Sequence, residues 1–319
     1  MEYTNLGRTG LHISRLILGT VNFGLNVTEE DAHIMLSHAL DSGINHLDTA
    51  NAYNNGLSET ILGNWIAKDT SRRDQIVLAT KVYFPFGDGQ NDGRLSAYHI
   101  RRACEASLRR LQTDHIDLYQ MHHIDRRTPW EEIWQAMELL VSQGKISYVG
   151  SSNFAGWDIA HAQGIADQRK FLGLVSEQSV YNLANRIIEL EVIPCCRELG
   201  VGVIPYNPVG GGLLCGVLDA PATHRRGEAR VRKEIEAYRP KLEAYEKFCR
   251  DIDEEPANVA LAWVLSRPDI TAPIIGPRTL AQLKGNLSAL MLNLDDATLT
   301  KLDEIWVGPG GEAPAAYAW

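Results

Sequence analysis

The sequence predicts an α/β protein whose eight parallel strands close into a (β/α)8 barrel of the TIM type. Eight short apolar segments recur along the chain, and each is followed by a helical pattern. Strands that are apolar on both faces and alternate with helices form parallel sheets. The chain has 319 residues and no linker-like composition between the units, so we expect one barrel domain spanning 1–319.

A doubly wound parallel sheet is the alternative architecture. It usually has fewer strand–helix units, and its dinucleotide-binding form carries a G-x-G-x-x-G motif after a strand. We find no such motif, because the glycine-rich stretch 210–216 has the wrong spacing, and no G-x-x-x-x-G-K-[ST] motif either. The barrel is therefore preferred.

Turns, helix caps and apolar runs predict the elements in order. The first fifteen residues form a β-hairpin, because two short segments flank a turn at 7–10. Thr28 suits the N-cap of the first helix, since three acidic residues follow it. The buried strands are expected at residues 16–19, 44–48, 76–81, 116–121, 146–150, 174–177, 202–206 and 271–275. Helices are expected at residues 28–42, 58–67, 96–111, 129–142, 157–167, 187–199, 233–251, 256–266, 279–290 and 295–304, the last ones forming extra C-terminal helices.

Composition limits the partners and the compartment. Hydrophobic residues make up 45% of the chain, enough for a full core, and a net charge of −9 argues against a nucleic-acid partner. The five cysteines include no C-x-x-C pair, which favours reduced thiols in a cytoplasmic protein. The N-terminus has no signal-peptide pattern, and no apolar run reaches bilayer length, so we expect no membrane association. The sequence leaves open whether the protein forms a homo-oligomer.

Ionisable residues end three successive predicted strands, at Asp48, Lys81 and His122. The chemistry of such a barrel lies at the carboxyl ends of its strands. Tyr53 follows Asp48 in the segment INHLDTANAY. A nearby ammonium lowers a phenol pKa from its reference of about 10, a carboxylate holds the ammonium, and a neutral histidine orients a carbonyl oxygen. Together the four residues predict a proton-delivery site for carbonyl reduction.

Each of these residues also has a structural interpretation. Asp48 could cap a turn, Lys81 could be only its ion-pair partner, Tyr53 could be a loop aromatic, and His122 could be a satisfied histidine. A metal site is a further alternative, on the residues His115, Asp117, His122, His123 and Asp125. The period of a strand weighs against it, because adjacent histidines point to opposite faces, and we expect no metal.

Several motifs make the resemblance to a known family specific. The segment LDTANAY, the lysine of LATKVY and the first histidine of DLYQMHHID resemble the aldo-keto reductase superfamily. The segments VGSSNF, SEQSVYN, IPYNPVGGGLL and PIIGPRTLAQLKGNL are similar to that family's cofactor-binding segments. The match covers nearly the whole chain and looks closest to bacterial NADP-dependent members, which are related to potassium-channel β-subunits.

The resemblance implies a catalytic tetrad of Asp48, Tyr53, Lys81 and His122. Tyr53 would be the general acid, Lys81 and Asp48 would tune it, and His122 would orient the carbonyl. It also implies NADP(H) as cofactor, with Asp48 beside the reacting ring. The implied contacts of the carboxamide are Ser152, Asn153 and Gln178, with Tyr206 stacked on the nicotinamide ring. The residues implied beside the ribose are Gly19, Thr20 and Val21, and those implied along the pyrophosphate are Asn207, Val209 and Gly212. The adenosine end would be held by Gly276, Arg278, Thr279, Gln282 and Asn286.

Arg278 decides the choice between the two nicotinamide cofactors. It precedes the N-terminus of the last barrel helix, where an anion is favoured, so its guanidinium could clamp a 2′-phosphate. A surface arginine is the structural alternative. Asn207 and Gly285 depart from residues common in the family, and Pro277 stiffens the loop, which affects the tightness of adenosine binding rather than the chemistry.

The substrate is expected to be a small carbonyl compound. The pocket would be lined by Phe23, Tyr53, Tyr83, Phe84, His122 and His123, with the loop 210–230 as a cover, and its aromatic rings suit a medium-sized, partly apolar compound. Two alternatives stay open. One is a reductase of a nucleotide-linked keto- or enoyl-sugar, suggested by His224, Arg225 and Arg226. The other is a cofactor-binding regulatory protein like the channel β-subunits.

Overall fold

The structure is a computed structural model that describes residues 1–218 and 229–318. Its centre is a sheet of eight strands in which every paired neighbour is parallel, in the order β10-β3-β4-β5-β6-β7-β8-β9. Parallel bridges Val203–Ile270 and Tyr206–Ile274 join the β9 segment to the β10 segment and close the ring. The predicted (β/α)8 barrel is confirmed. Its strands are β3 Ile17–Gly19, β4 His46–Asp48, β5 Val77–Val82, β6 Ile116–Met121, β7 Ile146–Ser152, β8 Leu174–Gln178, β9 Gly202–Val203 and β10 Ile274–Ile275.

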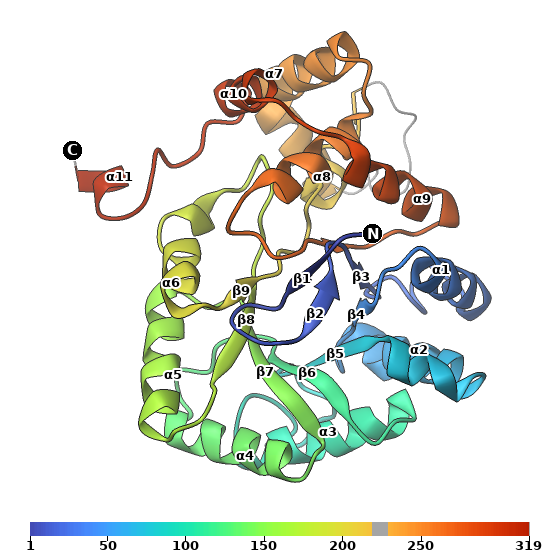
Figure 1. The fold of residues 1–319 in the computed structure, drawn as a ribbon, viewed down its shortest axis with the longest axis vertical. Helices are drawn as coiled ribbons and strands as arrows, with labels where there is room; N and C mark the ends of the chain where they lie inside the picture. The colour runs from blue at the N-terminus through green and yellow to red at the C-terminus, as the bar shows by residue number, and fades with distance from the viewer. Residues whose placement is uncertain (219–228, 319) are drawn as a thin grey trace.

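Helices surround this barrel (Figure 1). Those from α1 to α6 follow strands along the rim, while α7 and α10 lie together at one end of the molecule. The predicted N-cap of the first helix is confirmed, since the side chain of Thr28 accepts a hydrogen bond from the backbone N–H of Asp31 at 3.2 Å. The helices are α1 Glu29–Asp41, α2 Leu57–Ala67, α3 Ala97–Leu111, α4 Trp130–Ser142, α5 Gly156–Gln168, α6 Val192–Leu199, α7 Ala229–Asp251, α8 Pro256–Ser266, α9 Leu280–Ser288, α10 Asp296–Ile305 and α11 Ala315–Ala318.

The predicted N-terminal hairpin is confirmed and closes the amino end of the barrel. It pairs β1 Tyr3–Asn5 with β2 His12–Ser14, and its buried side chains Leu6 and Ile13 belong to the apolar cluster inside the barrel. Gly7 must be glycine, because its φ is +55° and a Cβ there would lie 2.6 Å from the carbonyl oxygen of Gly200. The hairpin therefore seals the end opposite to the carboxyl ends of the strands.

The interior of the barrel changes from apolar to polar along the strands. Val77 and Ala79 of β5 and Leu118 of β6 belong to the same internal cluster as the hairpin. Because side chains alternate along a strand, the next residues on that face are Lys81 and Gln120. The apolar layer thus supports a buried polar layer near the carboxyl ends.

Three predicted elements differ from the structure. The expected helix 187–199 is two pieces, a 3-10 helix Ile187–Glu189 and α6, because Pro194 lacks an N–H and fits only a first helical turn. The expected strands 202–206 and 271–275 shrink to two residues each, and bridges replace the rest.

The described cysteines form no disulfide. No helix in the described ranges is long and apolar enough to cross a bilayer.

Candidate active site

Lys81 joins the residues predicted to carry the chemistry. Its ammonium donates to Asp48 Oδ2 at 2.5 Å, to the carbonyl oxygen of Thr49 at 2.8 Å and to Tyr53 Oη at 3.2 Å. These three acceptors use all three of its protons. Lys81 is 0% exposed and Asp48 is 2% exposed, so the ion pair lies in a medium where its Coulomb interaction is strong. The structure thus places a fixed positive charge against a phenol.

The local backbone explains how Tyr53 reaches Lys81. After β4 the chain runs through Thr49, whose N–H donates to the carbonyl of Ala79, into a 3-10 turn Tyr53–Gly56. Asn54 and Asn55 in that turn have positive φ values of 49° and 52°, a conformation that asparagine tolerates better than most residues. The turn returns Tyr53 over the end of β5, where Lys81 Nζ lies 4.9 Å from the centroid of its ring.

Burial and charge act in opposite directions on this pair. Burial alone lowers the pKa of Lys81, but Asp48 and Tyr53 together raise it above its ordinary value. Burial raises the pKa of Tyr53 and outweighs the lowering by the Lys81 ammonium. The predicted net lowering of the tyrosine pKa is therefore wrong for the protein alone, because desolvation of a phenolate exceeds its attraction to Lys81. Because its pKa is raised, Tyr53 holds its proton at neutral pH.

His122 lies at the end of β6 beside Tyr53. Their ring centroids are 5.7 Å apart at 79°, and the ring of Phe84 lies 4.9 Å from His122 at 78°. Burial, together with the charges of Lys81 and His123, lowers the pKa of His122 to about 2. The imidazole is neutral, as predicted. Its buried Nδ1 makes no hydrogen bond to any part of the chain that the structure describes.

Sequence reasoning missed Gln120. Its Nε2 donates to Asp48 Oδ1 at 2.9 Å, and Gln178 Nε2 donates to the same oxygen at 3.0 Å. Gln120 precedes His122 by two residues, so the strand period places both on the inner face, and that signal could have found it. Gln178 was expected to contact a cofactor, and here it contacts the tetrad.

The predicted carboxamide and stacking residues come together on β7, β8 and the segment after β9. Tyr206 Oη donates to Asn153 Oδ1 at 2.9 Å, Asn153 Nδ2 donates to Ser152 Oγ at 2.9 Å, and Ser152 Oγ donates to the carbonyl of Gln178 at 2.8 Å. Asn153 has a positive φ of 60°, so the turn after β7 directs its amide to Tyr206. This chain of hydrogen bonds fixes the Tyr206 ring beside the Asn153 side-chain amide.

Glu177 supports these residues from the outer face of the barrel and was also missed. The carboxyl group is fully buried and accepts from Ser179 Oγ at 2.6 Å, from the N–H of Phe154 at 3.2 Å and from Ser151 Oγ. Burial raises the pKa of Glu177 to about 7, against these hydrogen bonds. It anchors the backbone on either side of Asn153.

The other predicted cofactor residues lie along β3, the segment after β9 and the N-terminus of α9. Gly19 is buried at the end of β3, and the hydroxyl of Thr20 is hydrogen-bonded to Ser58 Oγ at 2.8 Å, so it does not face the barrel mouth. Gln282 Oε1 accepts from the N–H of Arg278 at 2.7 Å, and Thr279 caps α9 by accepting from the N–H of Gln282. The members that keep partial or full exposure are Val21, Asn207, Val209, Gly212, Gly276, Arg278, Thr279, Gln282 and Asn286.

The predicted substrate residues divide into two groups. Tyr83, Phe84 and His123 lie together, since the Tyr83 ring is 5.3 Å from Phe84 and 5.2 Å from His123. Phe23, in contrast, is fully buried in the hydrophobic layer between strands and helices. Residues His224, Arg225 and Arg226 lie outside the described residues, as do residues 219–228 of the proposed covering loop.

Three of the residues weighed as metal ligands have other partners, although His115 Nε2 also lies 3.9 Å from Asp117 Oδ1. Asp117 pairs with Arg73 at 2.9 Å, His115 with Asp114 at 2.7 Å, and His123 Nδ1 contacts the carbonyl of Ile124. Within residues 1–218 and 229–318, no three His, Cys, Asp or Glu side chains form a group that could hold a metal ion.

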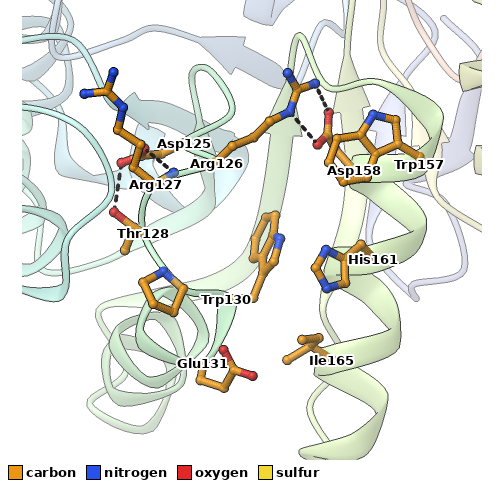
Figure 2. A pocket seen from close by; sticks show the side chains of 11 residues that line it. Asp125, Arg126, Arg127, Thr128, Trp130, Glu131, Trp157, Asp158, His161 and Ile165 are labelled. Carbon is orange, nitrogen blue, oxygen red and sulfur yellow. Dashed lines mark hydrogen bonds and ion pairs between the residues drawn. The ribbon is translucent and has the colours of Figure 1, made fainter.

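A surface cavity of about 380 Å³ lies between α4 and α5. Figure 2 shows Trp130 and His161 on its two sides and the ion pair of Arg126 with Asp158 above them. It shares no residue with the tetrad or with the predicted cofactor residues. The residues predicted to carry the chemistry therefore lie at the barrel mouth and not in this cavity.

Comparison with known proteins gives a consistent result. The model of the aldo/keto reductase family matches residues 15–307. The chain is 54% identical to an uncharacterized oxidoreductase of Bacillus subtilis over 100% of both chains. It is 34% identical to versiconal hemiacetal acetate reductase of Aspergillus parasiticus, covering 96% of this chain and 97% of that one. It is 31% identical to a probable voltage-gated potassium channel subunit beta of Arabidopsis thaliana, covering 91% of each.

Proposed function

The chain belongs to the aldo/keto reductase family, and from this premise we propose that it reduces an aldehyde or ketone to an alcohol with NADPH and with Tyr53 as proton donor. The observation that carries the proposal is the Lys81 ammonium, which bonds Asp48 and Tyr53 at once inside the barrel. The partner is a small carbonyl compound at the carboxyl ends of the strands.

The proton moves from Tyr53 to the carbonyl oxygen. NADPH, when bound, supplies the hydride to the carbonyl carbon. As the oxygen gains negative charge, the phenol gives up its proton, and the phenolate that remains lies 3.2 Å from the Lys81 ammonium. Asp48 holds that ammonium in place. The charge is thus fixed before reaction, so little reorganisation is needed when the negative charge develops.

The predicted cofactor residues fit a nicotinamide. A partly buried aromatic ring, Tyr206, stands beside the amide of Asn153, and the hydroxyl of Tyr206 is tied to that amide. An aromatic face beside a side-chain amide matches a flat ring that carries a carboxamide. Residues Ser152, Asn153, Gln178 and Tyr206 would hold that ring against the tetrad.

The pH profile of kcat/KM should show no inflection from the titration of a histidine. His122 acts as a neutral hydrogen-bonding group, because its pKa is lowered to about 2 from 6.5. A lowered histidine pKa keeps the neutral form present at every pH well above 2. We expect kcat/KM for carbonyl reduction to show no inflection near pH 6.5. An inflection there that disappears in the His122→Asn variant would contradict the assignment.

The preference for NADPH should depend on Arg278. The Arg278→Ala variant should raise the Kd of NADPH about tenfold to a hundredfold, the effect of one lost hydrogen bond to a charged group, and leave the Kd of NADH unchanged. Fluorescence titration measures both constants. The Lys284→Ala variant, on an exposed residue of α9, is the matched control. If Arg278→Ala raised the Kd of NADPH and the Kd of NADH by the same factor, Arg278 would not be a ligand of the 2′-phosphate.

A panel of carbonyl compounds tests the proposed reaction. We expect NADPH oxidation with an aromatic aldehyde such as 4-nitrobenzaldehyde, because Tyr83, Phe84 and His122 form an aromatic group near Tyr53. Nucleotide-linked keto-sugars belong in the same panel, as the alternative substrate class. No turnover with any member of a broad panel would reject the reductase.

A regulatory role is the second candidate function. The likeness to a probable potassium channel subunit beta favours it. The tetrad does not separate the two functions, since a cofactor-binding regulator could keep it. A stable complex with a partner protein, together with negligible turnover, would favour the regulatory role.

A further inference from the structure

The two oxygens of the Asp48 carboxylate have different partners. Oδ2 accepts from Lys81, while Oδ1 accepts from Gln120 Nε2 at 2.9 Å and from Gln178 Nε2 at 3.0 Å. Gln120 is 0% exposed and Gln178 is 3% exposed. A buried carboxylate oxygen without donors carries a large desolvation penalty, so the two amides hold the half of Asp48 that Lys81 does not reach.

Gln120 also determines which group Gln178 can offer to a ligand. Gln178 Nε2 donates to Asp48 Oδ1 and, at 3.2 Å, to Gln120 Oε1, so both of its protons are engaged. The group left to meet a ligand is Oε1, which can only accept. A primary carboxamide offers the N–H that this oxygen requires.

The neighbouring strand leaves room for Gln120. Gly150 of β7 pairs with Gln120 in the sheet register. A Cβ at position 150 would lie 3.0 Å from Gln120 Cγ and 2.5 Å from Ser176 Oγ. A larger residue at position 150 would therefore push Gln120 away from Asp48.

We propose that Gln120 is a positioning residue that couples the acid–base group to the cofactor site. It holds Asp48 through Nε2, and through Oε1 it turns the Gln178 amide so that its acceptor faces the nicotinamide carboxamide. This inference rests on the proposed function. In this account Asp48, Gln120 and Gln178 form a hydrogen-bonded triangle inside the barrel, beneath the reacting groups.

Two variants at position 120 test the inference. Gln120→Met keeps the length of the side chain and removes its donor and acceptor. We expect kcat to fall about tenfold to a hundredfold, the effect of one hydrogen bond to a charged group, and the Kd of NADPH to rise about tenfold. Gln120→Glu should recover much of the wild-type kcat at acid pH, where the introduced carboxyl group is protonated and donates to Asp48. Its kcat should fall as the pH rises and the two carboxylates repel each other.

The control is Gln163→Met, which removes an equally buried glutamine of α5 that bonds Asp167 at 2.8 Å and the carbonyl of Leu172. It should leave kcat and the Kd of NADPH unchanged even where it lowers stability. Suppose that the wild-type protein is active. If Gln120→Met then has the wild-type kcat and Kd of NADPH, or if the kcat of Gln120→Glu changes with pH as that of the wild type does, the inference is overturned while the proposed function stands. A wild-type protein that neither binds NADPH nor reduces a carbonyl would overturn the proposed function and the inference together. If Gln120→Met does not fold, the pH profile of Gln120→Glu decides.

Discussion

The Tyr53→Phe variant should lose carbonyl reduction by a factor of about 10² to 10⁴, the usual contribution of a positioned general acid. The phenol donates the proton, and phenylalanine has no proton to donate. NADPH should still bind with nearly the wild-type Kd, because Tyr53 is not among the predicted cofactor contacts. Steady-state kinetics and fluorescence titration on the same preparation measure the two quantities.

The Tyr53→Phe variant also separates chemistry from folding. Tyr53 is only partly buried and makes one side-chain hydrogen bond to Lys81 in the described chain, so its loss should change thermal stability little. Asn54→Ala, in the same turn, controls for a disturbed loop. Turnover of Tyr53→Phe within a few-fold of wild type, with NADPH bound, would show that another group delivers the proton.

The Lys81→Met variant should have the largest effect on stability. It removes the cation from a buried ion pair and leaves the Asp48 carboxylate uncompensated, which typically destabilises a protein by roughly 3–5 kcal/mol. Turnover should also be lost, because no charge then stabilises the Tyr53 phenolate. Denaturant unfolding measures the first effect and NADPH oxidation the second.

A double variant distinguishes the two effects of Lys81. Lys81→Met combined with Asp48→Asn removes both charges of this buried pair and keeps an oxygen that Gln120 and Gln178 can donate to. We expect most of the lost stability to return while turnover stays absent. A Lys81→Met variant as stable as wild type would contradict the buried ion pair, and an active double variant would contradict the role of the ammonium.

The fold could be predicted from local patterns because a barrel repeats one unit. Each strand is a short apolar run followed by a helix start, and Thr28 shows that even a single cap follows from side-chain chemistry. The exceptions depend on long-range pairing. Residues 202–206 and 271–275 have strand-like composition, but the ring closes there by isolated bridges, and the sequence holds no local signal for that.

The site was predictable where function requires unusual residues at strand ends. Asp48, Lys81 and His122 interrupt apolar runs, and Tyr53 follows in the next turn. Gln120 was missed because a glutamine inside a strand is not unusual by itself, and only the inner face shared with His122 distinguishes it. The direction of the Tyr53 pKa was wrong because burial depends on how the chain packs, whereas the Lys81 charge can be anticipated from the sequence.

The fate of a labelled hydride tests the central claim most directly. NADPH carrying deuterium at both positions of nicotinamide C4 is mixed with an aromatic aldehyde and the purified protein, and the alcohol is analysed by mass spectrometry. The proposal predicts one deuterium on the carbinol carbon with wild-type protein and almost no alcohol with Tyr53→Phe. Alcohol without deuterium, or equal labelled alcohol from both proteins, would contradict it.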